Sequence, residues 1–182
     1  LFAALGERVA YGAWWADGRP VGLYKDDTGA REAQANGRFR VFLQPGAHLR
    51  GLLAEISINQ IGFRGAEIAA EKPANGLRIW CLGGSTTFDI YAPDDASAWP
   101  ARVQSLVADA RPDRRVEVVN AGIPGELLSG NTEDLLTVGP RVLPDVVVVY
   151  AGPNDLRDVL RPNPGMSSPA VSAPGGPPVA PV

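Results

Sequence analysis

Leu77-Arg-Ile-Trp-Cys-Leu82 is a short apolar run that leads into Gly83-Gly84 and Ser85. Such a run predicts a buried strand, and the two glycines indicate a tight turn at its end. Two more runs of strand type follow it, Val116-Glu-Val-Val-Asn120 and Asp145-Val-Val-Val-Val-Tyr150. Because the last run is apolar without a break, we expect that strand to be buried on both faces.

Helical patterns separate the three predicted strands. Ser97 is the predicted N-cap of the first helix, in which apolar residues recur at helical spacing as far as Arg111-Pro112: Trp99, Val103, Leu106, Val107 and Ala110. A weaker helix is predicted from Leu127 to Leu143, with interruptions at Gly130 and Pro140. This alternation of strands and helices predicts an α/β fold built on a parallel sheet with right-handed crossovers.

The residues before and after this pattern have a different character. Polar and apolar side chains alternate in Arg38-Phe-Arg-Val-Phe-Leu43 and in Glu55-Ile-Ser-Ile-Asn59, as they do in half-buried strands. Tyr11-Gly-Ala-Trp-Trp15 is interpreted as an aromatic packing patch, and frequent proline beyond Arg161 excludes a helix or a central strand there. We therefore predict three parts: a β-rich extension over residues 1–76, the first part of an α/β domain over residues 77–160, and a Pro/Gly-rich loop or disordered tail over residues 161–182.

Composition excludes several classes of function. The 182 residues are 45% hydrophobic and carry a net charge of −3, which favours a globular protein without a nucleic-acid partner. One cysteine excludes an internal disulfide, and one histidine excludes a histidine-cluster metal site. No run stays apolar for the ~20 residues that cross a bilayer. Because the chain begins without methionine, we expect a processed or truncated piece, which leaves room for an upstream signal or membrane anchor.

Three loops at the ends of the predicted strands carry the candidate chemistry. Their sequences are Gly83-Gly-Ser-Thr-Thr87, Asn120-Ala-Gly-Ile-Pro-Gly125 and Ala151-Gly-Pro-Asn-Asp155. Because the carboxyl ends of parallel strands share one edge of a sheet, we expect the three loops to meet. Their residues suit acyl transfer, which needs a nucleophile and fixed hydrogen-bond donors for an oxyanion. The candidate catalytic residues are Ser85 as the nucleophile and, as donors, the backbone amides of Ser85 and Gly125 and the side-chain amide of Asn154.

The same loops resemble the sequence blocks of the GDSL/SGNH family of serine esterases, lipases and acetylhydrolases. Gly83-Gly-Ser-Thr86 is similar to the first block, Gly-Asp-Ser, with Gly84 in place of the aspartate. The second loop is similar to the block whose last glycine provides an oxyanion amide, and Gly152-Pro-Asn-Asp155 matches the third block, whose asparagine is a further donor. Asn59-Gln-Ile-Gly-Phe-Arg-Gly-Ala-Glu67 resembles a segment that precedes the first block in many bacterial members, which are often envelope-associated. The resemblance covers about residues 55–158.

This resemblance implies a flavodoxin-like three-layer α/β/α domain. It implies hydrolysis of carboxylic esters of small molecules or glycans through an acyl-enzyme on Ser85, without a cofactor, and a location in the cell envelope. Two alternatives stay open: an O-acyltransferase that acts on cell-envelope glycans, and a non-catalytic flavodoxin-like module that binds phosphate or a nucleotide. The sequence does not indicate the oligomeric state.

The family's fourth block, Asp-x-x-His, has no counterpart in this chain. A serine hydroxyl needs a base within about 2.6–3.2 Å to become a useful nucleophile. His48, the single histidine, lies in a polar turn context before Ser85 and is interpreted as a surface residue. We therefore expect a C-terminally truncated chain whose base lies in the missing remainder. We also expect the unpaired side of its sheet to promote aggregation.

Other polar and reactive side chains receive structural interpretations. Cys81 lies in an apolar strand and is expected in the core. Asn120 and Asp155 are expected to brace their loops by hydrogen bonds, and Arg64 and Glu67 to pair at the surface. Three acids are interpreted as solvated loop residues without a metal: Asp89, Asp94 and Asp95.

Overall fold

The structure, a computed structural model, describes residues 15–16, 19–20, 31–33, 39–50 and 54–160. Most of the aromatic patch at residues 11–15 and all of the tail at residues 161–182 lie outside the described residues. In the part of the chain that is described, no helix has the length and apolar character needed to cross a membrane.

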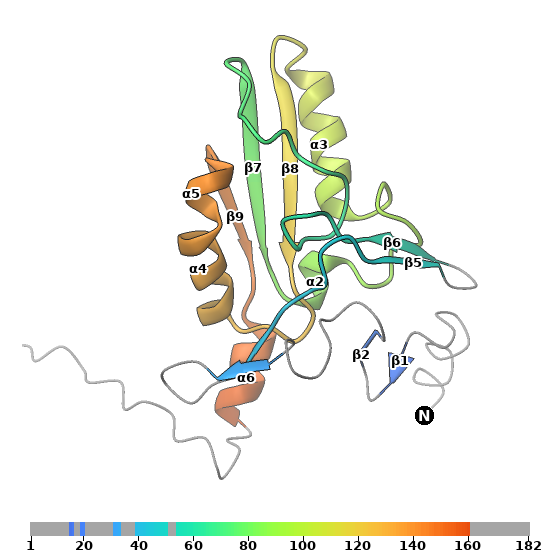
Figure 1. The fold of residues 1–182 in the computed structure, drawn as a ribbon, viewed down its shortest axis with the longest axis vertical. Helices are drawn as coiled ribbons and strands as arrows, with labels where there is room; N and C mark the ends of the chain where they lie inside the picture. Colours follow the sequence, from blue (N-terminus) through green and yellow to red (C-terminus); the bar gives the residue numbers. More distant parts are fainter. Residues whose placement is uncertain (1–14, 17–18, 21–30, 34–38, 51–53, 161–182) are drawn as a thin grey trace, which may run out of the picture.

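A parallel sheet of three strands forms the centre of the described chain (Figure 1). β7 (Gly76–Gly83) lies in the middle, with β8 (Arg115–Gly122) on one side and β9 (Val146–Tyr150) on the other. Gly83, the last residue of β7, lies opposite the last residue of β8 and the last residue of β9. The mixed α/β fold with a parallel sheet is confirmed, and the loops that follow the three strands begin at the same level.

Helices connect the strands and lie on either side of the sheet (Figure 1). α3 contacts β8, whereas the α4–α5 pair packs against the apolar core through Leu135, Val138 and Val142. The helices in chain order are α2 (Ser85–Phe88), α3 (Trp99–Ala110), α4 (Leu128–Thr137), α5 (Gly139–Val142) and α6 (Pro153–Leu160).

The start of α3 differs from the prediction by one residue. Its N-cap is Ala98 rather than Ser97, and Ala98 makes no side-chain cap bond. Instead, the backbone amide of Trp99 donates a 2.9 Å hydrogen bond to the Asp89 carboxylate, which comes from the preceding loop. A residue ten positions away therefore caps this helix, which a local pattern does not reveal.

The predicted interruption at Gly130 is wrong, because Gly130 lies inside α4. The break comes instead at Val138, which ends α4 and precedes α5. Pro140 lies in the first turn of α5, where its missing N–H is tolerated, whereas the same residue inside a helix would remove a hydrogen bond. The prediction of a break near Pro140 is therefore confirmed.

Short antiparallel pairs make up the described strands of the N-terminal part. The strands predicted at residues 38–43 and 55–59 are present but shorter than predicted. The pairs are β1 (Trp15–Ala16) with β2 (Arg19–Pro20), β3 (Arg31–Ala33) with β4 (Phe39–Val41), and β5 (His48–Arg50) with β6 (Glu55–Ser57).

One apolar core joins the N-terminal part to the sheet. The rings of Phe63 and Trp80 meet edge to face with their centroids 5.1 Å apart. The boundary predicted at residue 76 therefore marks a change of sequence pattern, and the residues on its two sides pack together. Buried members of this core are Leu43, Ile56, Ile58 and Phe63 before the boundary, and Trp80, Leu82, Val119 and Ala121 after it.

The prediction that β9 is buried on both faces is wrong. Val149 is 59% exposed and Tyr150 is 56% exposed, although these neighbours point to opposite faces of the sheet. The reason is position: β9 is an edge strand of the described sheet, and the helices cover β7 and β8 more fully. An apolar strand with an open edge favours pairing with other chains, so aggregation stays a prediction.

Leu143 ends α5 in a left-handed conformation, with φ of 56°, and its side chain is 55% exposed. That conformation costs a residue with a Cβ roughly 1–2 kcal/mol, and glycine avoids this cost. We expect Leu143→Gly to raise the free energy of unfolding by about 1 kcal/mol, measured by equilibrium urea denaturation. Leu136→Gly is the matched control, because the exposed Leu136 lies inside α4, where glycine should cost about 0.5–1 kcal/mol. An equal loss in both variants would contradict the prediction.

Candidate active site

The turn between β7 and α2 places Ser85 at the carboxyl edge of the sheet. A Cβ on Gly83 would collide with the backbone oxygen of Tyr150, and a Cβ on Gly84 would lie 2.6 Å from Asn154 Nδ2. At Gly83 a backbone group approaches so closely that only glycine leaves room for it, whereas at Gly84 a Cβ would have to displace the side chain of Asn154. Ser85 follows directly as the first residue of α2 and is half-buried.

The second loop makes a tight turn that carries Gly125. The Glu126 amide donates to the Ile123 carbonyl at 3.0 Å, and Gly125 has φ of 84°. Proline followed by glycine at the two central positions, with a positive φ at the glycine, is the pattern of a type II turn. The hydrogen bond of such a turn does not use the amide of the central glycine. The Gly125 amide is therefore available to a ligand, and Gly125 itself is exposed.

The third loop is bound to the second at two points. Asn154 Nδ2 donates to the Glu126 carbonyl at 2.9 Å, and the Asp155 carboxylate accepts the Leu128 amide at 3.0 and 3.3 Å. The expected bracing role of Asp155 is confirmed, because its carboxylate binds a first-turn amide of α4. Asn154 touches the residue before Ser85 and binds the residue after Gly125, so the structure brings the three predicted loops together.

Four contacts that the sequence analysis did not anticipate hold α2 and its turn in place. Thr87 Oγ1 donates to the Tyr150 carbonyl at 3.0 Å, and the indole of Trp99 donates to the Thr86 carbonyl at 3.0 Å. The Gly83 carbonyl accepts the Ile123 amide at 3.0 Å and Asn131 Nδ2 at 3.2 Å. One of these contacts had a signal in the sequence. Asn131 is a polar residue in a helix that must bury one face, and a buried polar side chain needs a hydrogen-bond partner.

Arg64 links the N-terminal part to the loop after α2 by hydrogen bonds and an ion pair. Its side chain is buried, and its Nε donates to the Asp95 carboxylate at 2.9 Å. Its other donors bind four backbone carbonyls, that of Phe88 at the end of α2 and those of Asp89, Ala92 and Asp94 in the loop. The predicted surface pair of Arg64 with Glu67 is wrong, because Glu67 accepts the Gln60 amide instead. The antiparallel bridge between Arg64 and Asn120 directs the guanidinium into the loop.

The loop acids after α2 are less solvated than predicted. Asp95 pairs with the buried Arg64 and accepts the Ser57 amide at 2.9 Å, and Asp89 caps α3. Asp94 is exposed as expected, although it binds the Ser97 amide at 2.6 Å, and this bonding lowers its pKa. Two of the three acids are therefore structural, and the error arose because their partners are distant in sequence.

Asn120 and Cys81 have the structural roles that were predicted for them. Asn120 Oδ1 accepts the Gly122 amide at 3.2 Å, and its Nδ2 donates to the Phe88 carbonyl at 3.3 Å. Cys81 is buried within β7, and this burial raises the pKa of its thiol to about 12. A thiol with so high a pKa is protonated at neutral pH and is a poor nucleophile.

His48 does not belong to the three loops. It lies on β5, its ring exposed, with Nδ1 3.0 Å from Ser57 Oγ and Nε2 2.9 Å from a Glu55 carboxylate oxygen. Both ring nitrogens are thus occupied by side chains of the adjacent strand. The interpretation of His48 as a surface residue is confirmed, although it lies on a strand rather than in a turn.

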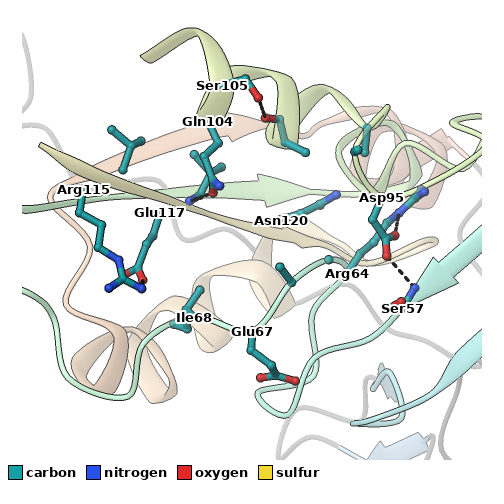
Figure 2. Close-up of a pocket in the computed structure, with 17 residues that line it drawn as sticks. Ser57, Arg64, Glu67, Ile68, Asp95, Gln104, Ser105, Arg115, Glu117 and Asn120 are labelled. Carbon is teal, nitrogen blue, oxygen red and sulfur yellow. Dashed lines mark hydrogen bonds and ion pairs between the residues drawn. The ribbon is translucent and has the colours of Figure 1, made fainter. Parts of the chain in front are cut away.

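A cavity of about 660 Å³ lies along the outer edge of β8 and, of the three loops, is lined only by Asn120 (Figure 2). It separates α3 from the segment at residues 64–68, and neither Ser85 nor Asn154 lines it. The polar groups in it largely bind one another: Arg64 binds Asp95, and Gln104 Oε1 accepts the Val118 amide at 2.8 Å (Figure 2). Within the described residues, no cluster of His, Cys, Asp and Glu side chains could hold a metal ion, here or elsewhere.

No protein-family model matches the chain, and no curated protein sequence matches it. The three loops around Ser85 are therefore the feature of the molecule that bears on its function.

Proposed function

We propose that the chain belongs to a serine ester hydrolase of the GDSL/SGNH type with a flavodoxin-like three-layer α/β/α fold. The strand order supports the fold, because the second, first and third strands of a flavodoxin-like sheet are neighbours in that order, as are β8, β7 and β9. The observation that carries the activity is the position of Asn154. Its side-chain amide lies against Gly84, the residue before the proposed nucleophile.

In the proposed reaction, Ser85 Oγ forms a bond to the ester carbonyl carbon and loses its proton to a base. The carbonyl oxygen becomes an oxyanion, which accepts hydrogen bonds from the amides of Ser85 and Gly125 and from Asn154 Nδ2. Cleavage of the bond to the alcohol oxygen, which takes up the proton, leaves an acyl-enzyme. Water then attacks the acyl-enzyme, releases the carboxylic acid and restores the serine.

The base in this proposal comes from polypeptide outside these 182 residues. His48 is the single histidine, and its nitrogens are occupied on β5. An Asp-His pair from such polypeptide would take the proton of Ser85 and orient the ring. Without this pair a slow reaction remains, because the three donors and substrate binding alone retain part of the catalysis. The reaction becomes faster as hydroxide becomes more available to take the proton of Ser85.

Labelling with a fluorophosphonate tests the proposal, because this probe phosphonylates activated serines. We expect slow labelling of Ser85 that accelerates with rising pH and is abolished by Ser85→Ala. Ser105→Ala is the control, since Ser105 lies exposed on α3 and bonds only to the Ala101 carbonyl. Labelling that persists in Ser85→Ala would favour the non-catalytic alternative, a module that binds phosphate or a nucleotide. So would a chain that is not labelled but that inorganic phosphate protects against unfolding. Product analysis with a sugar acceptor then separates hydrolysis from acyl transfer.

A further inference from the structure

Glu126 lies where the three loops meet. It follows Gly125 directly and is only 6% exposed. Its carbonyl oxygen accepts Asn154 Nδ2 at 2.9 Å and lies 3.8 Å from the point that a Cβ on Gly84 would occupy. One carbonyl group of Glu126 therefore contacts the third loop and approaches the first.

This contact has a geometric consequence for Asn154. A carboxamide nitrogen carries two N–H bonds in one plane, so a hydrogen bond made by one of them sets the direction of the other. The first N–H of Asn154 is held by the Glu126 carbonyl, and the nitrogen itself lies against Gly84. The position of Glu126 thus determines where the second N–H of Asn154 points.

Packing against α4 holds Glu126 in this position. Its carboxylate accepts the Leu127 amide at 3.1 Å and lies against Gly130, where an added Cβ would collide with the carboxylate oxygen. Its own amide closes the turn that presents Gly125. A glycine inside a helix costs stability, and the space that Glu126 needs is the physical reason for Gly130.

We infer that Glu126, seated against Gly130, is a positioning residue that aligns Asn154 and the Gly125 turn as donors for an oxyanion. The inference depends on the proposed function for its role in catalysis, but the alignment of Asn154 can be measured separately. Glu126 contacts no reacting atom in this scheme, and it acts through Asn154 and Gly125.

Two variants displace Glu126 without touching the donors. Gly130→Ala forces its carboxylate away, and Glu126→Ala removes the side chain that packs on α4. Glu126→Gln keeps both the size and an acceptor oxygen and should restore wild-type behaviour. Ser129→Ala is the matched control, because Ser129 is an exposed residue of the same helix.

Two measurements decide the inference. In NMR spectra, the side-chain amide signals of Asn154, assigned by their loss in Asn154→Ala, should move in Gly130→Ala and Glu126→Ala but stay in place in Glu126→Gln and Ser129→Ala. The rate of fluorophosphonate labelling at Ser85 should fall about tenfold to a hundredfold in the two displacing variants, since small misplacements of a positioned group have effects of this size. In an Asn154→Ala background the same changes should lower the rate by clearly less, because only the part of their effect that passes through the Gly125 turn remains.

Asn154 signals that do not move, or rates that fall equally in both backgrounds, would overturn the positioning role. If the wild-type chain shows no labelling beyond that of Ser85→Ala, the proposed hydrolase function fails. The NMR signals of Asn154 still decide in that case whether Glu126 aligns the amide.

Discussion

Gly84→Ala should lower the rate of fluorophosphonate labelling at Ser85 by about a hundredfold or more, the typical cost of losing one oxyanion donor. The added Cβ would lie 2.6 Å from Asn154 Nδ2, closer than carbon and nitrogen atoms approach in folded proteins. Asn154 has little freedom to retreat, because the same nitrogen is bound to the Glu126 carbonyl. Gly84→Asp should have at least the same effect, although it creates the Gly-Asp-Ser order of the family's first block.

The fold should survive this substitution. Gly84 has φ of −92° and ψ of −146°, so Gly84→Ala does not force a residue with a Cβ into the left-handed region of positive φ. Gly139→Ala is a suitable control, since the Cβ there would meet only the flexible side chain of Leu135, at 3.2 Å. Wild-type labelling in Gly84→Ala with an unchanged unfolding transition would show that Asn154 contributes nothing at Ser85.

Arg64→Lys should lower the free energy of unfolding by about 3–5 kcal/mol, because each buried carbonyl that loses its donor costs about 1–3 kcal/mol. Arg64 is 2% exposed, and its side chain donates hydrogen bonds to the Asp95 carboxylate and to four carbonyls at 2.7–3.3 Å. Its guanidinium also lies over the Phe88 ring, 5.2 Å from the ring centroid. A lysine keeps the charge but has one nitrogen, so it leaves several buried carbonyls without a donor.

Equilibrium urea denaturation measures this loss. Arg50→Lys is the matched control, because Arg50 is an exposed strand residue that pairs with Glu55 at 3.1 Å. Exposed pairs of this kind contribute about 0–1 kcal/mol, so the control should remain close to the wild-type chain. Similar small effects in both variants would mean that the guanidinium contacts of Arg64 do not stabilise the loop after α2.

Local patterns identified the elements and the loops of this chain but not the contacts between them. The three strands, the helix at Trp99 and the glycine-rich turns can be recognised because periodicity and turn chemistry act over a few residues. The partners of Arg64 lie 24 to 31 residues away in the sequence, and Asp89 caps a helix that starts ten residues later. No short-range signal carries such pairings, so Arg64 and two of the three loop acids were misassigned.

The exposure of β9 is the clearest case of a property that a pattern cannot supply. The apolar sequence of β9 shows that the strand is able to be buried. How many strands and helices cover it depends on the assembled sheet.

By itself the amino-acid order determined an α/β chain, a serine placed after two glycines, and three small-residue loops at the ends of three strands. Only the tertiary structure decided that Asn154 lies against Gly84, that it binds the Glu126 carbonyl, and that Arg64 is buried. The physical reason is that local conformation depends on neighbours in the chain, whereas close packing and buried hydrogen bonds depend on residues that meet only after the chain has folded.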